Sequence, residues 1–218
     1  MNKFPMSFSR LSTFETCPMK FEYMYVLKSV EDESNVYSEY GQRVHTALEM
    51  YGRTGDVAHL TDESRKYKST VDLLRGKRGT KLWEQQMAID ANGTPCDWFS
   101  PDVWLRGIVD AMVADLPLAV VVDWKTGKVK HDYTQLDMFA MFTFAHYPEV
   151  QEVKAAYAWL KDNSAAGTSY TRDSVVKPWG AVRKRLDVVQ DAVELGVFPA
   201  KPGWMCKYCP AKKVCPYA

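Results

Sequence analysis

Two aspartates and a lysine near the middle of the chain have the types and the spacing of a hydrolytic metal site. Asp123 and Lys125 are two residues apart in a valine-rich run that predicts a strand, so their side chains share one face. Asp110 arrives from the preceding predicted strand. Carboxylates bind Mg²⁺ or Mn²⁺, the metal lowers the pKa of a bound water, and an ammonium group orients that water or stabilises charge on a phosphate. These residues therefore favour phosphodiester hydrolysis.

The elements that must position these side chains follow from the hydrophobic periodicity. We expect helices at residues 9–25, 37–52, 62–74, 131–146 and 179–196, and strands at 82–90, 103–115, 119–125, 153–160 and 168–172. The second helix has His45 and Glu49 on one face. The fourth has Gln135 in its first turn, directed back toward the strand ends. Glu84, on the first strand, could approach the site, but we interpret it as a solvent-facing side chain.

Two segments carry a family resemblance. Residues 107–110 (Gly-Ile-Val-Asp) and 123–127 (Asp-Trp-Lys-Thr-Gly) resemble the PD-(D/E)XK nuclease superfamily, and specifically its RecB-like branch. Residues 41–49 look like the helix by which RecB-like nucleases add a histidine ligand, and residues 133–140 look like their glutamine-centred helix. That helix often carries a tyrosine four residues after the glutamine. Here Phe139 stands at that position, and the nearest phenol is Tyr133.

The resemblance implies an α/β fold, with a restriction-endonuclease-like α-β-β-β-α-β core and a central mixed sheet flanked by helices. It implies that one or two Mn²⁺ or Mg²⁺ ions are held by His45, Asp110, Asp123 and the backbone carbonyl of Trp124. Lys125 would position or deprotonate the attacking water. Gln135 and Tyr133 would steady the phosphate or the lysine.

Four of the five cysteines are arranged like ligands of one metal centre. Cys206, Cys209 and Cys215 have the spacing C-x2-C-x5-C, and Cys17 is the natural fourth ligand. Two thiolates separated by two residues can bind one centre without straining the chain. Cys96 stands apart, in a segment that reads as a loop.

The thiolates alone leave zinc and an iron–sulfur cluster both open, because each accepts four of them. Disulfides are the least expected use, since the first residues lack the pattern of a signal peptide. Cys17-Pro18 followed by three cysteines beyond the core resembles the iron–sulfur clasp of AddB and of CRISPR-associated RecB-like exonucleases. The resemblance implies a [4Fe–4S] cluster, with structural Zn²⁺ as the alternative, joining residues 1–30 to residues 200–218.

The 218 residues, 46% of them hydrophobic, suit a single domain spanning 1–218. The net charge of +1 argues against a general nucleic-acid coat protein, but two basic groups are candidates for phosphate contacts. These are Arg65, Lys66, Lys68, Arg75, Lys77, Arg78 and Lys81, and then Lys177, Arg183, Lys184 and Arg185. The acidic segment 31–34 reads as a surface loop. No window has the roughly 20 apolar residues of a membrane helix, so we expect a cytoplasmic protein.

Together with the resemblance, these patterns predict a metal-dependent DNA exonuclease in recombination, repair or replication. The resemblance implies that it acts 5′→3′ on single-stranded DNA or DNA ends. One alternative is a CRISPR-adaptation nuclease that trims DNA ends within an integrase complex. Another is a non-catalytic module that binds DNA ends, although such a module would be expected to lack an acid or the lysine. Besides DNA, a recombination or CRISPR-adaptation protein is the expected kind of partner.

Overall fold

The computed structural model describes residues 3–31 and 36–217, and its centre is a five-stranded sheet in the order β1-β2-β3-β4-β5. The strands are β1 (Thr80–Ile89), β2 (Leu105–Asp115), β3 (Leu118–Lys125), β4 (Glu152–Trp159) and β5 (Ser164–Thr171). Neighbours are antiparallel except β3 and β4, which are parallel. A parallel pair needs a crossover connection, which α6 (Thr134–His146) supplies. The predicted mixed sheet with its α-β-β-β-α-β order is confirmed.

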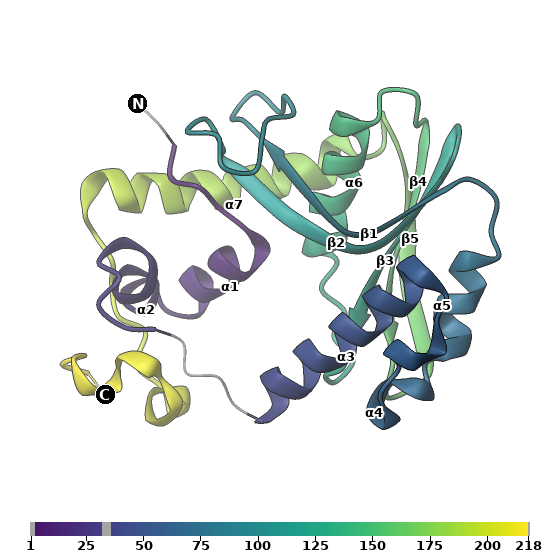
Figure 1. Ribbon diagram of the computed structural model, residues 1–218. Helices are drawn as coiled ribbons and strands as arrows, with labels where there is room; N and C mark the ends of the chain where they lie inside the picture. The colour runs from purple at the N-terminus through teal and green to yellow at the C-terminus, as the bar shows by residue number, and fades with distance from the viewer. Residues whose placement is uncertain (1–2, 32–35, 218) are drawn as a thin grey trace.

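Helices cover both faces of this sheet (Figure 1). One face carries α3 (Val36–Thr54), α4 (Asp62–Arg65) and α5 (Lys68–Arg75), with a short 3₁₀ turn at Val57–His59. The other carries α6 and α7 (Val176–Leu195), beside which lie α1 (Phe8–Thr16), α2 (Pro18–Phe21) and a π-helical turn, Glu22–Val26. The C-terminal segment forms 3₁₀ turns at Trp204–Tyr208 and Pro210–Lys213 and lies beside α2 (Figure 1).

Each face of the sheet has its own apolar layer. On the α3 side, Val44 and Leu48 pack with Val71 of α5 and Trp124 of β3. On the opposite side, the aromatic and aliphatic side chains of α6 pack with those of α1, α7 and the strands. Nearly every turn of α6 is buried, including Phe139 at 1% exposure. A helix that is apolar on all sides belongs in the interior, and α6 therefore holds its first turn rigidly beside the strand ends.

Strand β1 reverses its alternation at Glu84. In a regular strand Trp83, Met87 and Ile89 would all face the same side. Instead Trp83 packs in the layer under α3, whereas Met87 and Ile89 pack in the layer that contains α6. Glu84 has a left-handed backbone with φ of 48°, which turns the strand over. The carboxylate of Glu84 consequently sits where the two halves of β1 change faces.

Strand β2 changes faces at the same level and leaves β3 there. Ala111 packs on the α3 side and Val109 on the α6 side. The ladder between β2 and β3 ends at the pair Ala111–Val122. Beyond this pair, a side chain replaces the backbone as hydrogen-bond acceptor: Asp110 Oδ2 accepts a 2.7 Å hydrogen bond from the backbone N–H of Trp124. Asp110 thus stands in the fork between two diverging strands.

Several predicted boundaries are wrong. The single helix expected at 9–25 is interrupted at Cys17, whose backbone is extended, and Pro18 then begins α2. Proline has no N–H to continue a helix and is preferred in a first turn. The helix expected at 62–74 is divided into α4 and α5, and the last strand begins at Ser164 instead of residue 168. The acidic segment 31–34 lies almost wholly outside the described residues.

The first basic group belongs largely to a packed part of the fold. Val71 of α5 is fully buried, Lys68 pairs with Asp72 at 2.6 Å, and Arg75 donates to the carbonyl oxygens of Tyr51 and Gly52. These contacts tie α5 to α3. None of the described helices is long and apolar enough to cross a lipid bilayer.

Candidate metal and catalytic site

Three potential metal donors converge from three elements. His45 of α3, Glu84 of β1 and Asp110 of β2 each offer a ligand atom, and these atoms all lie within 4.8 Å of one another. His45 Nδ1 is 3.5 Å from Asp110 Oδ2. One imidazole nitrogen and two carboxylate oxygens suit a divalent ion, and the nitrogen favours Mn²⁺ over Mg²⁺.

Close packing of α3 against the sheet brings His45 to this point. A Cβ atom on Gly52 would lie 2.5 Å from the ring of Trp83, so only glycine permits the approach at that end. At the other end, a Cβ on Gly41 would be 3.1 Å from Thr126 Oγ1, just beyond β3. The helix therefore crosses the sheet closely on both sides of His45, whose side chain is 25% exposed.

The donors are electrostatically crowded. Burial, together with the charge of Asp110, raises the pKa of Glu84 to about 7. Burial alone would lower the pKa of His45, but its hydrogen bond to Asp110 and the surrounding carboxylates outweigh that effect and raise it. A bound cation stabilises the ionised forms of neighbouring acids that otherwise repel each other. Both the donor types and their electrostatics therefore fit a divalent metal.

Asp123, Lys125 and Gln135 form a closed triangle beside the donors. Lys125 Nζ is 2.6 Å from Asp123 Oδ2 and donates to Gln135 Oε1 at 2.8 Å. Gln135 Nε2 in turn donates to Asp123 Oδ1 at 2.9 Å. The amide of α6 thereby holds both strand residues at once. The expected direction of Gln135, back toward the strand ends, agrees with these contacts.

Asp123 is a deeply buried acid, at 3% exposure. Burial and the charge of Asp110 raise its pKa to about 7, although Lys125 acts in the opposite direction. Its Oδ2 lies 2.6 Å from the ammonium group of Lys125. The positive charge of Lys125 therefore compensates part of the cost of burying this carboxylate.

Glu84 is the site residue whose place the sequence interpretation missed. It is half-buried beside His45 and Asp110, and the interpretation of it as a solvent-facing side chain is wrong. A strand of regular alternation would have directed it elsewhere, and the left-handed backbone that redirects it leaves no pattern in a single sequence. Its position two residues into the first predicted strand was the only available signal.

Trp124 and Tyr133, for which the sequence predicts roles at the site, differ in their contacts with it. Trp124 contacts the site through its N–H, and a metal-binding role for its carbonyl stays a prediction. Tyr133 stacks on Tyr157, with ring centroids 6.2 Å apart, and no contact joins it to the described catalytic triangle. Lys125 Nζ lies 5.1 Å from the centroid of the Tyr157 ring, so the phenol nearest the lysine comes from β4.

Two pockets adjoin the triangle and share Phe8 and Gln135 in their walls. One, of about 500 Å³, also includes Lys128 and Lys130 of the loop after β3. The other, of about 320 Å³, includes Arg10 of α1 and Arg106 of β2. Aromatic rings and basic groups thus line both pockets, and Lys125 itself lines the first.

The four predicted cysteine ligands line one pocket between the α1–α2 region and the C-terminal segment. Backbone N–H groups are directed at two of the sulfurs, because Lys201 N donates to Cys17 Sγ at 3.4 Å and Gly203 N donates to Cys206 Sγ at 3.3 Å. In the described part of the chain, no three cysteine sulfurs lie within 4.8 Å of one another.

Comparisons with solved structures show proteins of similar fold. Among solved structures, the chain is similar to the "Putative exonuclease" of Eubacterium rectale, with 14% identity, a TM-score of 0.58, and coverage of 98% of this chain and 90% of that one. It also matches SSO0001 with 15% identity, a TM-score of 0.45, and coverage of 99% and 87%. Likeness at such identities concerns the fold alone, and no curated protein matches the chain.

The model of the PD-(D/E)XK nuclease superfamily matches residues 5–216, which is nearly the entire chain. The mixed five-stranded sheet flanked by helices is consistent with the fold of that superfamily. The chain belongs to the PD-(D/E)XK nuclease superfamily.

Proposed function

We propose that this protein is a metal-dependent DNA exonuclease of the RecB-like branch. The observation that carries the proposal is the position of Lys125, bound to Asp123 and Gln135 directly beside the histidine and carboxylate donors. A half-exposed lysine paired with a buried acid is poised to handle a proton or to stabilise charge, and a divalent ion beside it would complete a phosphodiesterase site.

The chemistry divides between the two halves of the site. His45, Glu84 and Asp110 would hold a divalent ion together with Asp123, and the ion supplies a bound water of lowered pKa. Lys125 orients that water and balances the charge that develops on the phosphate. Gln135 keeps the ammonium group of Lys125 against Asp123 between turnovers.

The substrate is a nucleic-acid strand with at least one unpaired stretch. The pockets on either side of Gln135 combine rings, such as Phe8, with the basic groups of Arg106 and Lys128. Proteins that bind single strands use this combination, because the rings stack on bases while the cations follow the phosphates. A threaded strand also suits attack from a DNA end, and the resemblance of the clasp to iron–sulfur exonucleases supports the direction 5′→3′.

The cysteine pocket is proposed to hold a [4Fe–4S] cluster that closes the clasp between residues 1–30 and 200–218. Four cysteine side chains line this pocket, and four thiolates are the ligand set that such a cluster requires. The N–H groups directed at Cys17 and Cys206 are the kind of hydrogen bonds that tune such clusters.

One experiment tests the proposed activity and its end requirement together. Purified protein is incubated with Mn²⁺, Mg²⁺ or EDTA and with end-labelled linear single strands, duplexes and closed circular single strands. We expect metal-dependent release of short products from linear strands only, and protection when the 5′ end is blocked. Efficient cutting of circles would show an endonuclease instead, and binding to ends without any cleavage would show a non-catalytic module.

A further inference from the structure

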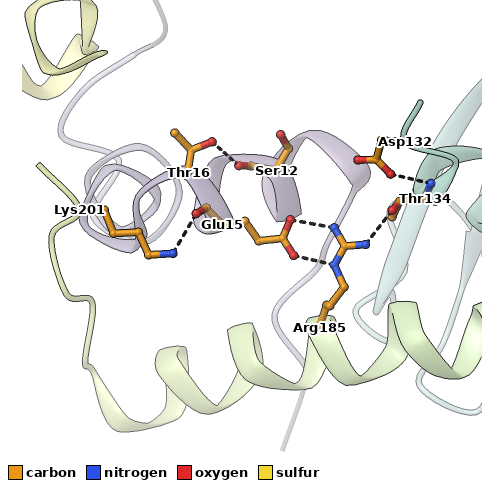
Figure 2. Close-up of polar contacts among 7 residues, drawn as sticks. All are labelled: Ser12, Glu15, Thr16, Asp132, Thr134, Arg185 and Lys201. Atoms are coloured by element: carbon orange, nitrogen blue, oxygen red, sulfur yellow. Dashed lines mark hydrogen bonds and ion pairs between the residues drawn. The ribbon is translucent and has the colours of Figure 1, made fainter. Parts of the chain in front are cut away.

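Arg185 of α7 joins α1 to the first turn of α6 (Figure 2). Its Nε and Nη2 donate to the two carboxylate oxygens of Glu15 at 2.6 and 2.8 Å, and its Nη1 donates to Thr134 Oγ1 at 2.7 Å. A bidentate arginine–carboxylate pair has a fixed planar geometry. One guanidinium therefore sets the spacing between two helices that lie far apart in the sequence.

The contact with Thr134 acts one residue away from the catalytic triangle. Thr134 precedes Gln135, whose amide contacts Lys125 Nζ at 2.8 Å and Asp123 Oδ1 at 2.9 Å. On its other side, the N–H of Thr134 donates to Asp132 Oδ1 at 2.9 Å (Figure 2). The first turn of α6 is thus held from two directions, and a shift of Thr134 would move the amide of Gln135.

The contact with Glu15 leads to the cysteine pocket. Glu15 is two residues before Cys17, and its carbonyl oxygen accepts a 2.9 Å hydrogen bond from Lys201 Nζ (Figure 2). The backbone N–H of Lys201 donates to Cys17 Sγ. A continuous chain of hydrogen bonds therefore runs from a cysteine sulfur through Glu15 and Arg185 to the helix that holds Gln135.

The contribution of these contacts to folding stability is small. The side chains of Arg185 and Glu15 are 36% and 39% exposed, and ion pairs with such access to solvent add little to folding. Small displacements near a reacting centre, in contrast, have large effects on rate. The main effect of the Arg185 contacts is therefore on the position of Gln135.

We propose that Arg185 is a positioning residue that acts through Thr134 and Gln135 on the catalytic lysine, and that the same contacts couple the cysteine pocket to turnover. The inference rests on the proposed function, because it takes Lys125 as the group that acts on the phosphate. Arg185 itself touches neither the triangle nor the metal donors in any described contact.

The decisive variant is Thr134→Val, which keeps the shape of the side chain and removes only the oxygen that accepts from Arg185. We expect the turnover number at saturating DNA to fall at least about tenfold, with the half-saturating DNA concentration unchanged. Thr134→Ser restores the acceptor and should restore turnover. Arg185→Gln should behave like Thr134→Val.

The matched control is Glu194→Gln, nine residues later on α7, where the carboxylate pairs with Lys3 at 4.0 Å at the surface. This variant should turn over normally. Circular dichroism and thermal melting of every variant establish that each is folded. Normal turnover in folded Thr134→Val protein would overturn the inference, whereas an inactive wild-type enzyme would overturn the proposed function instead.

Coupling to the cysteine pocket is measured with a double-mutant cycle. Lys201→Met removes the hydrogen bond to the carbonyl of Glu15 and is combined with Thr134→Val. If one chain of contacts carries both effects, the loss of turnover in the double variant is smaller than the product of the two single losses. Independent, multiplicative losses would show that Lys201 and Thr134 act separately and would end the coupling part of the proposal.

Discussion

Glu84 and Asp110 stand opposite each other on β1 and β2, between the paired residues Trp83–Ala111 and Gln85–Val109. Both strands change faces at this level, and Glu84 has a left-handed backbone. Such a conformation costs a non-glycine residue roughly 1–2 kcal/mol. Backbone strain and like charges are thus concentrated at one point of the sheet, where a metal ion would be bound.

Replacing Glu84 should separate stability from metal binding. Glycine adopts a positive φ freely, so we expect Glu84→Gly to leave the melting temperature of the metal-free protein unchanged or higher. Its affinity for Mn²⁺ should fall, because one carboxylate donor is lost. Calorimetric titration and thermal melting with and without Mn²⁺ measure both. Gln85→Gly, at a residue without a left-handed backbone, is the control and should lower stability. Unchanged Mn²⁺ affinity in Glu84→Gly would rule out Glu84 as a ligand.

The raised pKa values of Glu84 and Asp123 predict that folding stability and metal affinity change in opposite directions with pH. Each pKa lies at about 7 in the folded protein and near 4 in an unfolded chain. Between these values the folded state binds more protons, so the unfolding free energy of the metal-free protein falls as pH rises toward 7. Metal affinity should rise over the same range, because the metal binds the ionised acids. Denaturant unfolding and Mn²⁺ titration at pH 5, 6, 7 and 8 check both slopes.

Removing the catalytic ammonium should abolish cleavage while the fold remains. Lys125→Met keeps the length of the side chain but removes the charge beside Asp123, and we expect the rate to fall by about 10²-fold or more. Initial rates on end-labelled DNA measure the effect. Lys154→Met removes an exposed lysine of β4 that pairs with Glu152 and should leave the rate unchanged. Near-normal cleavage by Lys125→Met would falsify the assigned role.

Neutralising the loop after β3 should weaken DNA binding in a salt-dependent way. In a cleavage-deficient Asp123→Asn background, Lys128→Gln combined with Lys130→Gln should lower single-strand affinity. The slope of log affinity against log salt should flatten by about 1.4, since each phosphate contact to a single strand contributes roughly 0.7. Fluorescence anisotropy at several salt concentrations gives the slope. A control pair outside both basic groups, Lys3→Gln with Lys154→Gln, changes the net charge equally. An equal effect of both pairs would mean that only net charge matters.

The cysteine pocket should contain iron and sulfide. Anaerobically purified protein is expected to be brown, with about four iron atoms per chain, and Cys209→Ser should lose both the colour and thermal stability, because the binding energy of the centre is partly folding energy. Cys96→Ser, which replaces the cysteine outside the pocket, should retain both. Elemental analysis that finds stoichiometric zinc in colourless protein would establish the zinc alternative.

The local parts of the site could be predicted from the sequence. Asp123 and Lys125 share a face because a strand repeats every two residues, and Gln135 lies close to them because only the eight-residue loop 126–133 separates β3 from α6. The order of strands and helices likewise follows from periodicity and turn residues. Alternation and helical spacing are properties of neighbouring residues, so the chain determines them without knowledge of distant contacts.

Tertiary structure decided what depends on distant partners. Glu84 joins the metal donors only because β1 turns over at a left-handed residue, against the alternation that its sequence suggests. Arg185 appeared as one member of a basic group, and its ion pair with Glu15, 170 residues away, becomes visible only once α1 and α7 are packed together. The sequence by itself determined which groups could do the chemistry, whereas packing decided which of them meet, because the energies that select between faces arise from contacts across the whole fold.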